Sequence, residues 1–382
     1  MQRGKGMEKR LMENLGISPS LLGFGCMRFP VTADGKIDEA TAEKMLDRAM
    51  EMGVTYYDTA YPYHGGDSEP FVGRVLNKYD RSSYFLATKL PIWLVESREE
   101  AEKKFYKQLE RLDKDYVDFY LIHALDKERF EKVKKLDIVG MCEDLRKKGK
   151  IRYLGFSFHD DYEVFEEIIN YHHWDFCQIQ YNYMDTEIQA GDKGYRLAEE
   201  KGIPMVIMEP VRGGLLSGFS QDIEEMFRKV NPDKSVASWA LRWVASHPNV
   251  KVVLSGMSDP DQVEDNLSTF NNFQPLSAKE EETVKQVVDT LRARVQNRCT
   301  GCRYCMPCPQ GVNIPDSFRI WNDYHIYQKY SVVKDRWEGM KEEEKPMNCV
   351  ECGACEEQCP QKINIREDLK RVQAELDAPQ WK

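Results

Sequence analysis

The chain has 382 residues, of which 41% are hydrophobic, and its formal net charge at pH 7 is −10. This length suits one large domain together with a small one, and the net negative charge argues against nucleic acid and anionic membranes as partners. No apolar run approaches the roughly eighteen residues that a membrane-spanning helix needs.

After a basic stretch at 1–10, which we expect to form a loose leader, short apolar runs alternate with longer amphipathic stretches. The short runs have the length of strands, and the longer stretches carry apolar residues at helical spacing. Strands are predicted at 21–24, 54–58, 84–89, 117–123, 151–157, 176–180, 204–208 and 251–255. The helices that follow them are predicted at 38–52, 68–78, 97–112, 138–148, 161–171, 193–201, 235–247 and 260–270.

Eight such units in about 255 residues favour an α/β fold of the (β/α)8 TIM-barrel type, because right-handed crossovers close the series into a parallel barrel. A doubly wound sheet is the alternative, but no Gly-x-Gly-x-x-Gly turn follows the first strand. We therefore predict a barrel domain at 1–275, a linking helix at 276–298 and a small cysteine-rich domain at 299–382.

Two similar cysteine runs define the last of these domains. Cys-x2-Cys-x2-Cys-x2-Cys-Pro begins at Cys299, and Cys-x2-Cys-x2-Cys-x3-Cys-Pro begins at Cys349. Three thiolates on a tight loop can hold one face of a [4Fe–4S] cube, while the fourth, before Pro, ligates the other cube. One cluster is therefore assigned to Cys299, Cys302, Cys305 and Cys359, and the second to Cys349, Cys352, Cys355 and Cys308.

The stretch 299–366 resembles a bacterial two-cluster ferredoxin, apart from the shorter last spacing of its first run and the long segment between the runs. Two four-cysteine zinc sites are the alternative, but zinc usually takes separated Cys-x2-Cys pairs. Disulfides are disfavoured because no signal peptide begins the sequence, and we expect a reducing, cytoplasmic setting. The other cysteines, Cys26, Cys142 and Cys177, are expected to be small core residues.

Polar residues follow three successive strands, where a barrel of this kind places its functional groups. Asp58 and Tyr63 come after the second strand, Lys89 after the third and His123 after the fourth. Four segments resemble the aldo-keto reductase family over about residues 16–270: GFGCMR at 23–28, YDTAYPY at 57–63, ATKL at 87–90 and LIH at 121–123. The last three contain the positions just named. Members of that family with a C-terminal ferredoxin-like domain resemble the whole chain.

Carbonyl reduction by hydride leaves an alkoxide that must take a proton. Tyr63 is the predicted acid, and Lys89 is expected to stabilise its phenolate and lower its pKa. Asp58 would hold Lys89, His123 would bond to the carbonyl oxygen, and Trp93 would line the substrate pocket or simply pack in the core. The alternative is an ion pair without catalysis beside a packed tyrosine, but four matching residues at three successive strand ends argue against it.

The resemblance also implies a nicotinamide coenzyme, NAD(H) or NADP(H). The family's Ser-Asn pair after the fifth strand appears here as Ser157-Phe158, and its glutamine on the sixth strand as Gln178. Its stacking aromatic after the seventh strand is replaced by Met208, whose thioether can also lie on a ring.

The backbone amides of Gly213 and Gly214 could approach a pyrophosphate, although a plain flexible loop is the alternative. Asn266 completes the predicted coenzyme site. The loop at 255–266 is acidic and lacks the Lys and Arg that hold the 2′-phosphate in family members that prefer NADPH. NADH should therefore serve at least as well, unless Arg212 compensates.

The leading prediction is an NAD(P)H-linked carbonyl reductase or alcohol dehydrogenase joined to a ferredoxin module and acting on a small molecule. The alternative is an electron-transfer protein whose barrel docks a partner or binds a flavin, with little catalysis of its own. A flavin is a candidate because a hydride carries two electrons and a cluster passes one, although no flavin fingerprint occurs. Two clusters in series favour a relay to an external redox protein, and the acidic composition suits a basic docking surface on it.

Overall fold

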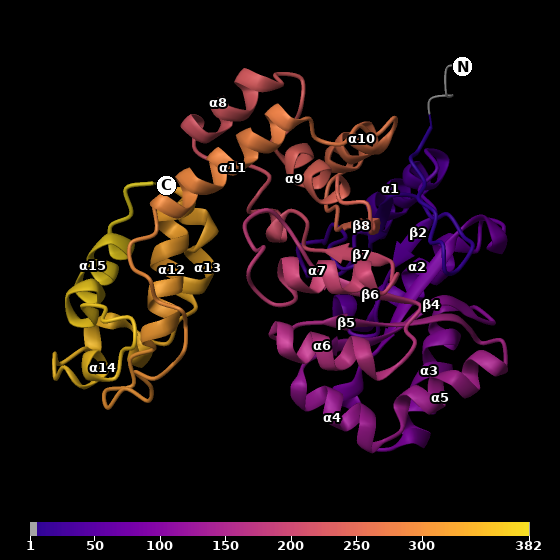
Figure 1. Cartoon of the computed structure of the whole chain (residues 1–382), viewed down its shortest axis with the longest axis horizontal. Helices are drawn as coiled ribbons and strands as arrows, with labels where there is room; N and C mark the ends of the chain where they lie inside the picture. Colours follow the sequence, from indigo (N-terminus) through magenta and orange to yellow (C-terminus); the bar gives the residue numbers. More distant parts are fainter. Residues whose placement is uncertain (1–5, 382) are drawn as a thin grey trace. The chain divides into compact units, whose positions relative to one another are not determined.

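The computed structural model describes residues 6–381. Eight parallel strands form a closed barrel in which each strand pairs with its neighbours in sequence and β8 closes on β1 (Figure 1). The strands are β1 (Leu22–Gly25), β2 (Tyr56–Asp58), β3 (Phe85–Leu90), β4 (Val117–Leu125), β5 (Ile151–Phe158), β6 (Phe176–Gln180), β7 (Met205–Met208) and β8 (Val250–Ser255). The predicted (β/α)8 barrel is confirmed.

Every predicted helix is present within a few residues of its expected limits. The helices that follow the strands are α1 (Glu39–Glu51), α2 (Ser68–Leu76), α3 (Arg98–Leu112), α5 (Ile138–Lys147), α6 (Tyr162–Tyr171), α7 (Gly191–Glu200), α9 (Val236–Ala245) and α10 (Pro260–Phe270). An additional helix, α4 (Lys127–Lys135), was not predicted. Only Phe130 and Val133 of α4 are buried, so its sequence carries too narrow an apolar stripe to signal a helix.

The barrel interior is filled by aromatic and branched side chains, among them Tyr56, Phe119 and Phe176. Met12 belongs to the same cluster and is fully buried. The expectation of a loose leader is therefore wrong for its described part, because Met7 and Lys9 form antiparallel bridges with Asn271 and Ser20. The leader residues at 1–5 lie outside the described part of the chain.

The chain divides into two compact units. The first comprises Met1–Gly214 and Ala237–Ser277, and the second Leu215–Val236 and Ala278–Lys382. The second unit thus includes 215–236, a stretch that the sequence placed within the barrel domain. Its helices are α8 (Gln221–Val230), α11 (Ala278–Ala293), α12 (Ile314–Tyr327), α13 (Lys334–Glu338), α14 (Ala354–Glu357) and α15 (Ile365–Asp377).

The second unit has its own hydrophobic core. Trp321, Tyr324 and Trp337 are buried there with Leu369 and Val372, so aromatic residues between the two cysteine runs build this core. Among residues 6–381, no helix is both long and apolar enough to cross a membrane.

Candidate functional site

Lys89 is the centre of a polar group at the ends of β2 and β3. Its ammonium lies 2.5 Å from Oδ1 of Asp58, and it donates to the Thr59 carbonyl at 2.8 Å and to the Tyr63 hydroxyl at 3.2 Å. Lys89 and Asp58 are almost completely buried, with 1% and 3% of their surface exposed. Lys89, predicted from the third strand end, is therefore in direct contact with Asp58 and Tyr63, both predicted from the second.

Burial decides the protonation of the tyrosine in this group. It raises the pKa of Tyr63, and the ammonium of Lys89 opposes that shift without reversing it. Lys89 therefore lowers this pKa, as expected, but the loss of water around the phenol outweighs the nearby positive charge, so the pKa stays above its ordinary value. The phenol is protonated at neutral pH.

Lys89 and Asp58 form an ion pair out of contact with water. Burial alone would lower the pKa of Lys89, but Asp58 and Tyr63 together outweigh it, so the pKa lies above its ordinary value. Burial raises the pKa of Asp58 while Lys89 opposes the shift. At a separation of 2.5 Å, the charged ammonium favours the carboxylate form of Asp58, and we describe the pair as ionised.

His123 stands beside this group on β4. Its ring centroid is 6.0 Å from that of Tyr63 and 5.1 Å from that of Trp93. Burial, followed by the charge of Lys89, holds the pKa of His123 well below its ordinary value, so the imidazole is neutral at pH 7. Trp93 is partly exposed, with the Arg129 guanidinium over its ring at 5.1 Å, so it is not a core residue.

Two of the predicted coenzyme residues lie on β5 and β6. The Ser157 hydroxyl accepts a hydrogen bond from the backbone N–H of Ala124 at 2.7 Å, next to His123. Gln178 is buried, and its Oε1 accepts no hydrogen bond from the described residues. A buried amide oxygen without a donor fits an amide ligand such as the nicotinamide carboxamide. Phe158, by contrast, packs against Phe165 of α6 at 5.2 Å and does not replace the family's asparagine.

The remaining predicted coenzyme residues follow β7 and β8. Met208 ends β7 and is half-buried. Gly213 and Gly214 have φ angles of 65° and 99°, which glycine tolerates and which turn the backbone sharply after that strand. Asn266, on α10, donates from its side-chain amide to the Ser255 hydroxyl at 2.8 Å, so it fixes the end of β8.

Arg28 is a residue of this rim that the sequence analysis did not single out. Its guanidinium pairs with Glu209 at 3.7 Å, and its stem covers Gly256, where a side chain would press on it at 3.3 Å. It therefore reaches from the end of β1 to the loops after β7 and β8. The same strand-end rule that selected Asp58 would have found it, since Arg28 closes the first family-like segment.

Two cavities in the second unit gather the cysteines of the runs. One is lined by Cys299, Cys302, Cys305 and Cys359, and the other by Cys308, Cys349, Cys352 and Cys355; Cys305 lines both cavities. This grouping is the one that the crossed ligand assignment requires. Within residues 6–381, no three His, Cys, Asp or Glu side chains are drawn together closely enough to bind a single ion. A [4Fe–4S] cube fills the space between its thiolates, so cysteines that line a cavity fit it.

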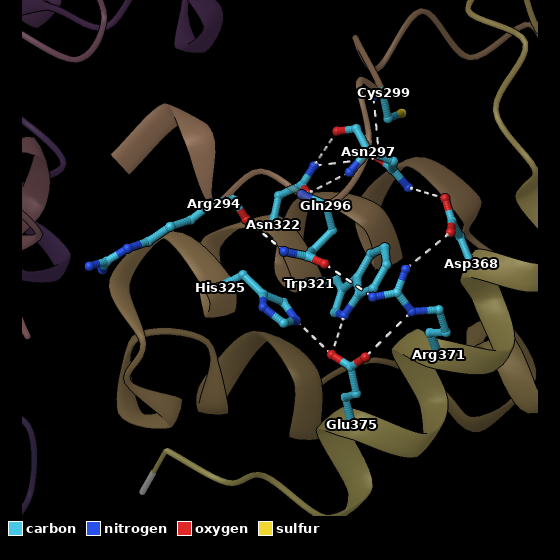
Figure 2. Close-up of polar contacts among 10 residues, drawn as sticks. All are labelled: Arg294, Gln296, Asn297, Cys299, Trp321, Asn322, His325, Asp368, Arg371 and Glu375. Carbon is cyan, nitrogen blue, oxygen red and sulfur yellow. Dashed lines mark hydrogen bonds and ion pairs between the residues drawn. The ribbon is translucent and has the colours of Figure 1, made fainter. Parts of the chain in front are cut away.

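A hydrogen-bond network supports the first cavity (Figure 2). Asn297 accepts from the backbone N–H of Cys299 at 3.3 Å and donates to Asp368 of α15 at 3.0 Å. Asn322 of α12 donates to the Asn297 carbonyl at 3.0 Å and accepts from its N–H at 3.3 Å. The first cysteine of the run is thus tied through one asparagine to both long helices of this unit.

The same network continues along α15. Glu375 accepts from the Trp321 indole at 2.8 Å and contacts His325 at 2.6 Å. Arg371 donates to Gln296 at 3.1 Å and lies over the Trp321 ring at 4.7 Å (Figure 2). The spacing of the cysteines could not predict these contacts, because the residues that form them come from three segments far apart in the sequence.

The other buried cysteines agree with their predicted role. Cys26, Cys142 and Cys177 are each fully buried, outside both runs. Burial raises the pKa of each thiol. They are core residues, as predicted.

Comparison with known proteins gives two family matches. Residues 21–289 match the model of the aldo/keto reductase family, and residues 298–363 match that of the 4Fe-4S dicluster domain. "Aldo-keto reductase YhdN" of Bacillus subtilis is 27% identical over 297 residues, which cover 68% of this chain and 87% of that protein. "NADH-specific methylglyoxal reductase" of Escherichia coli is 24% identical over 281 residues, covering 62% and 85%.

Solved structures show the same barrel. The holo form of aldo-keto reductase AKR11C1 from Bacillus halodurans has a TM-score of 0.62 at 28% identity and covers 73% of this chain and 96% of that one. An aldo-keto reductase from Klebsiella pneumoniae in complex with NADPH has a TM-score of 0.61 at 22% identity, covering 75% and 96%. At that identity the second likeness shows the fold alone.

Proposed function

This chain belongs to the aldo/keto reductase family and carries a 4Fe-4S dicluster domain, and on that premise we propose that it reduces a small carbonyl compound, or oxidises the alcohol, by hydride exchange with a nicotinamide coenzyme. One observation carries the proposal: the buried ammonium of Lys89 is within hydrogen-bonding distance of both Asp58 and Tyr63. A buried cation that bonds to a phenol prepares that phenol to release a proton.

In this proposal Tyr63 delivers the proton. When bound, the coenzyme supplies the hydride, and the carbonyl oxygen then needs one proton to become a hydroxyl. Burial keeps the Tyr63 phenol protonated at neutral pH, so it is ready to donate. The phenolate left behind would be costly to bury alone, and the Lys89 ammonium at 3.2 Å offsets that cost. Asp58 keeps the ammonium charged and in place.

His123 is proposed to orient the substrate. A neutral imidazole has one N–H to donate, and Nδ1 of His123 has no partner among the described residues. Donation from the ring to the carbonyl oxygen would place that oxygen beside Tyr63 and stabilise the charge that develops on it. Trp93, with its ring next to His123, would line the substrate pocket.

Gln178, Ser157, Met208, Gly213, Gly214 and Asn266 are proposed to hold the coenzyme, with the carboxamide at Gln178. We expect NADH to bind at least as tightly as NADPH, because Asp259 and Asp261 begin α10 where a 2′-phosphate would lie. The Escherichia coli relative is described as NADH-specific, and the Klebsiella pneumoniae structure contains NADPH. Binding titrations with the two coenzymes decide the preference, and a strong preference for NADPH would contradict the proposal.

The two clusters are proposed to act as an electron relay to an external one-electron redox protein. Tyr304, Met347 and Val350 are 67%, 64% and 61% exposed, the highest values among the large hydrophobic side chains described. Tyr304 and Val350 line the second cysteine cavity, and Met347 lines a groove that shares Cys349 with it. Apolar side chains exposed around a redox centre support docking of a partner there.

The relay and the catalysis are tested separately. NADH oxidation by a panel of aldehydes, compared with Tyr63→Phe, tests the reductase. If no aldehyde is reduced, the alternative holds, in which the barrel is a docking or flavin-binding module of an electron-transfer protein. Anaerobic stopped-flow absorbance tests the relay. If neither NADH nor substrate changes the cluster spectrum, with or without added flavin and a low-potential donor, the clusters are structural.

A further inference from the structure

The loop that carries Tyr63 is held on both sides of that residue by one side chain of α3. The guanidinium of Arg111 donates to the carbonyl of Tyr61 at 3.3 Å and to the carbonyl of Gly66 at shorter range. It also lies over the Tyr61 ring, 4.3 Å from the centroid. Tyr61 precedes Tyr63 by two residues and Gly66 follows it by three, so Arg111 spans the loop.

This loop has little regular structure of its own to hold it. His64, Gly65 and Gly66 have φ angles of 51°, 64° and 109°, which are costly for a residue with a side chain. A backbone in such conformations persists only where its surroundings fix it. At Gly66 a side chain would press against the Arg111 guanidinium at 3.1 Å, so the close approach of the arginine requires glycine there.

Glu69, at the start of α2, holds the arginine in turn. Its Oε2 lies 3.2 Å from Nε of Arg111, and the carboxylate is fully buried. Helices α2 and α3 are close enough for this contact because Gly73 has no side chain, and a Cβ there would overlap the Leu112 carbonyl. The buried pair therefore fixes the loop to two helices at once.

The other oxygen of Glu69 reaches the strand that carries Lys89. Oε1 accepts from the Thr88 hydroxyl and from the Gln108 side-chain amide, both at 2.7 Å. The same Gln108 amide donates to the Lys89 carbonyl at 2.9 Å. One chain of buried polar contacts thus joins the backbone on both sides of Tyr63 to the backbone of Lys89.

We propose that Arg111 and Glu69 are positioning residues that set the distance between the Tyr63 hydroxyl and the Lys89 ammonium. This inference rests on the proposed function, in which that distance governs proton delivery. Neither residue touches the reacting atoms. Their role is to keep two groups from different strand ends in register, because a misplacement of about 1 Å can reduce a rate about 100-fold.

A purely structural ion pair is the competing explanation, and the barrel offers a matched control for it. Arg81 donates to the carbonyls of Tyr84 at 3.1 Å and Tyr116 at 3.3 Å, pairs with the buried Asp118 at 2.6 Å, and lies over the Tyr116 ring at 4.1 Å. It makes the same set of contacts as Arg111, to two backbone carbonyls, a buried carboxylate and an aromatic ring. It does so before β3, away from the strand ends that carry the site.

The experiment compares Arg111→Met, Glu69→Gln and Arg81→Met in the full chain with both clusters loaded. The probe is reduction of 4-nitrobenzaldehyde by NADH, with kcat and KM measured across pH and the melting temperature recorded for each variant. We expect Arg111→Met to lower kcat about 10- to 100-fold with KM for NADH within about twofold. Arg81→Met should lose comparable thermal stability while keeping kcat within about twofold.

The pH profile separates positioning from stability. When Tyr63 moves away from Lys89, the ammonium no longer lowers its pKa, so the alkaline limb of kcat should shift upward in Arg111→Met and Glu69→Gln. Glu69→Gln keeps the shape of the side chain and serves as the second variant if Arg111→Met does not fold. Equal kcat and unchanged profiles in Glu69→Gln and Arg81→Met would overturn the proposal. Failure of the proposed function is distinct, because the wild type would then show no reduction that depends on Tyr63.

Discussion

The hydroxyl of Tyr63 lies 3.2 Å from the ammonium of Lys89, although Lys89 lies on β3 and Tyr63 lies in the loop after β2. The contact places a phenol and a cation together in a region where Lys89 is almost free of water. At this distance the ammonium acts on either protonation state of the phenol, so the pair is the feature on which the proposed chemistry depends.

Lys89→Met should reduce kcat for an aldehyde by about 100-fold or more, because the phenolate of Tyr63 loses its counter-charge. The substitution also leaves Asp58 buried without a partner, which costs about 3–5 kcal/mol of stability. The double variant Asp58→Asn/Lys89→Met separates the loss of catalysis from the loss of stability. It should regain the stability that Lys89→Met loses but remain inactive. Lys78→Met removes an exposed lysine and is the control. A double variant with wild-type kcat would contradict the role of Lys89.

The pH dependence of kcat follows from the shifted pKa values of Tyr63 and His123. The pKa of Tyr63 is raised from 10.0, so the protonated phenol persists as pH rises through neutrality and is lost only above its ordinary range. The pKa of His123 is lowered well below 6.5, so the neutral imidazole persists as pH falls below 6.5. Aldehyde reduction should therefore have constant kcat between about pH 6.5 and 9. Steady-state rates in overlapping buffers test this, and a fall in kcat between pH 7 and 8 would be the contrary result.

The crossed ligand assignment predicts which pairs of cysteine substitutions remove the iron of one cluster and which remove the iron of both. The wild type should hold about eight irons and eight labile sulfides per chain. Cys302→Ser with Cys359→Ser should damage only the first cluster and retain about four irons, whereas Cys302→Ser with Cys349→Ser should lose both. Iron and sulfide are measured after anaerobic reconstitution, with Cys177→Ser as the control. Loss of nearly all the iron from the first pair as well would show uncrossed ligation, because Cys302 and Cys359 would then belong to different clusters. Stoichiometric zinc in the wild type would exclude the clusters.

Asn297→Ala should loosen the first cluster, because the N–H of Cys299 and the carboxylate of Asp368 both lose their partner. Iron release to a chelator should be about 10-fold faster for half of the iron, the range expected when a group behind a ligand is removed. Asn348→Ala is the control. Its amide donates to the Glu342 and Lys345 carbonyls beside the second run. Equal rates of iron release in Asn297→Ala and Asn348→Ala would show that Asn297 contributes only to packing.

The fold was predictable because its signals are local. Eight alternations of strand and helix leave few topologies, and the strand-end rule selected Asp58, Lys89 and His123 without any contact information. The cysteine spacing was equally local. Of the elements that were missed, α4 carries few apolar residues. Helix α8 was missed although Ile223, Met226, Phe227 and Val230 follow helical spacing and could have predicted it.

The site was less predictable where a property depends on three dimensions. The direction of the Tyr63 pKa shift requires knowing how much water surrounds the phenol, and no sequence pattern reports that. The contact between Glu69 and Arg111 joins two helices at positions 42 residues apart, with no motif spacing to suggest it. Phe158 illustrates the opposite case. The sequence marked it as a departure from the family, and the structure shows it packed against α6.

The central claim is that Tyr63 supplies the proton in a carbonyl reduction. Its most direct test is a single turnover of the anaerobic protein with NADH and 4-nitrobenzaldehyde, in the wild type and in Tyr63→Phe, with coenzyme binding and iron content measured in parallel. The account predicts NADH oxidation in the wild type and a rate at least about 100-fold lower in Tyr63→Phe, with coenzyme affinity and iron content unchanged. Equal rates in the two proteins, or no oxidation in either, would contradict it.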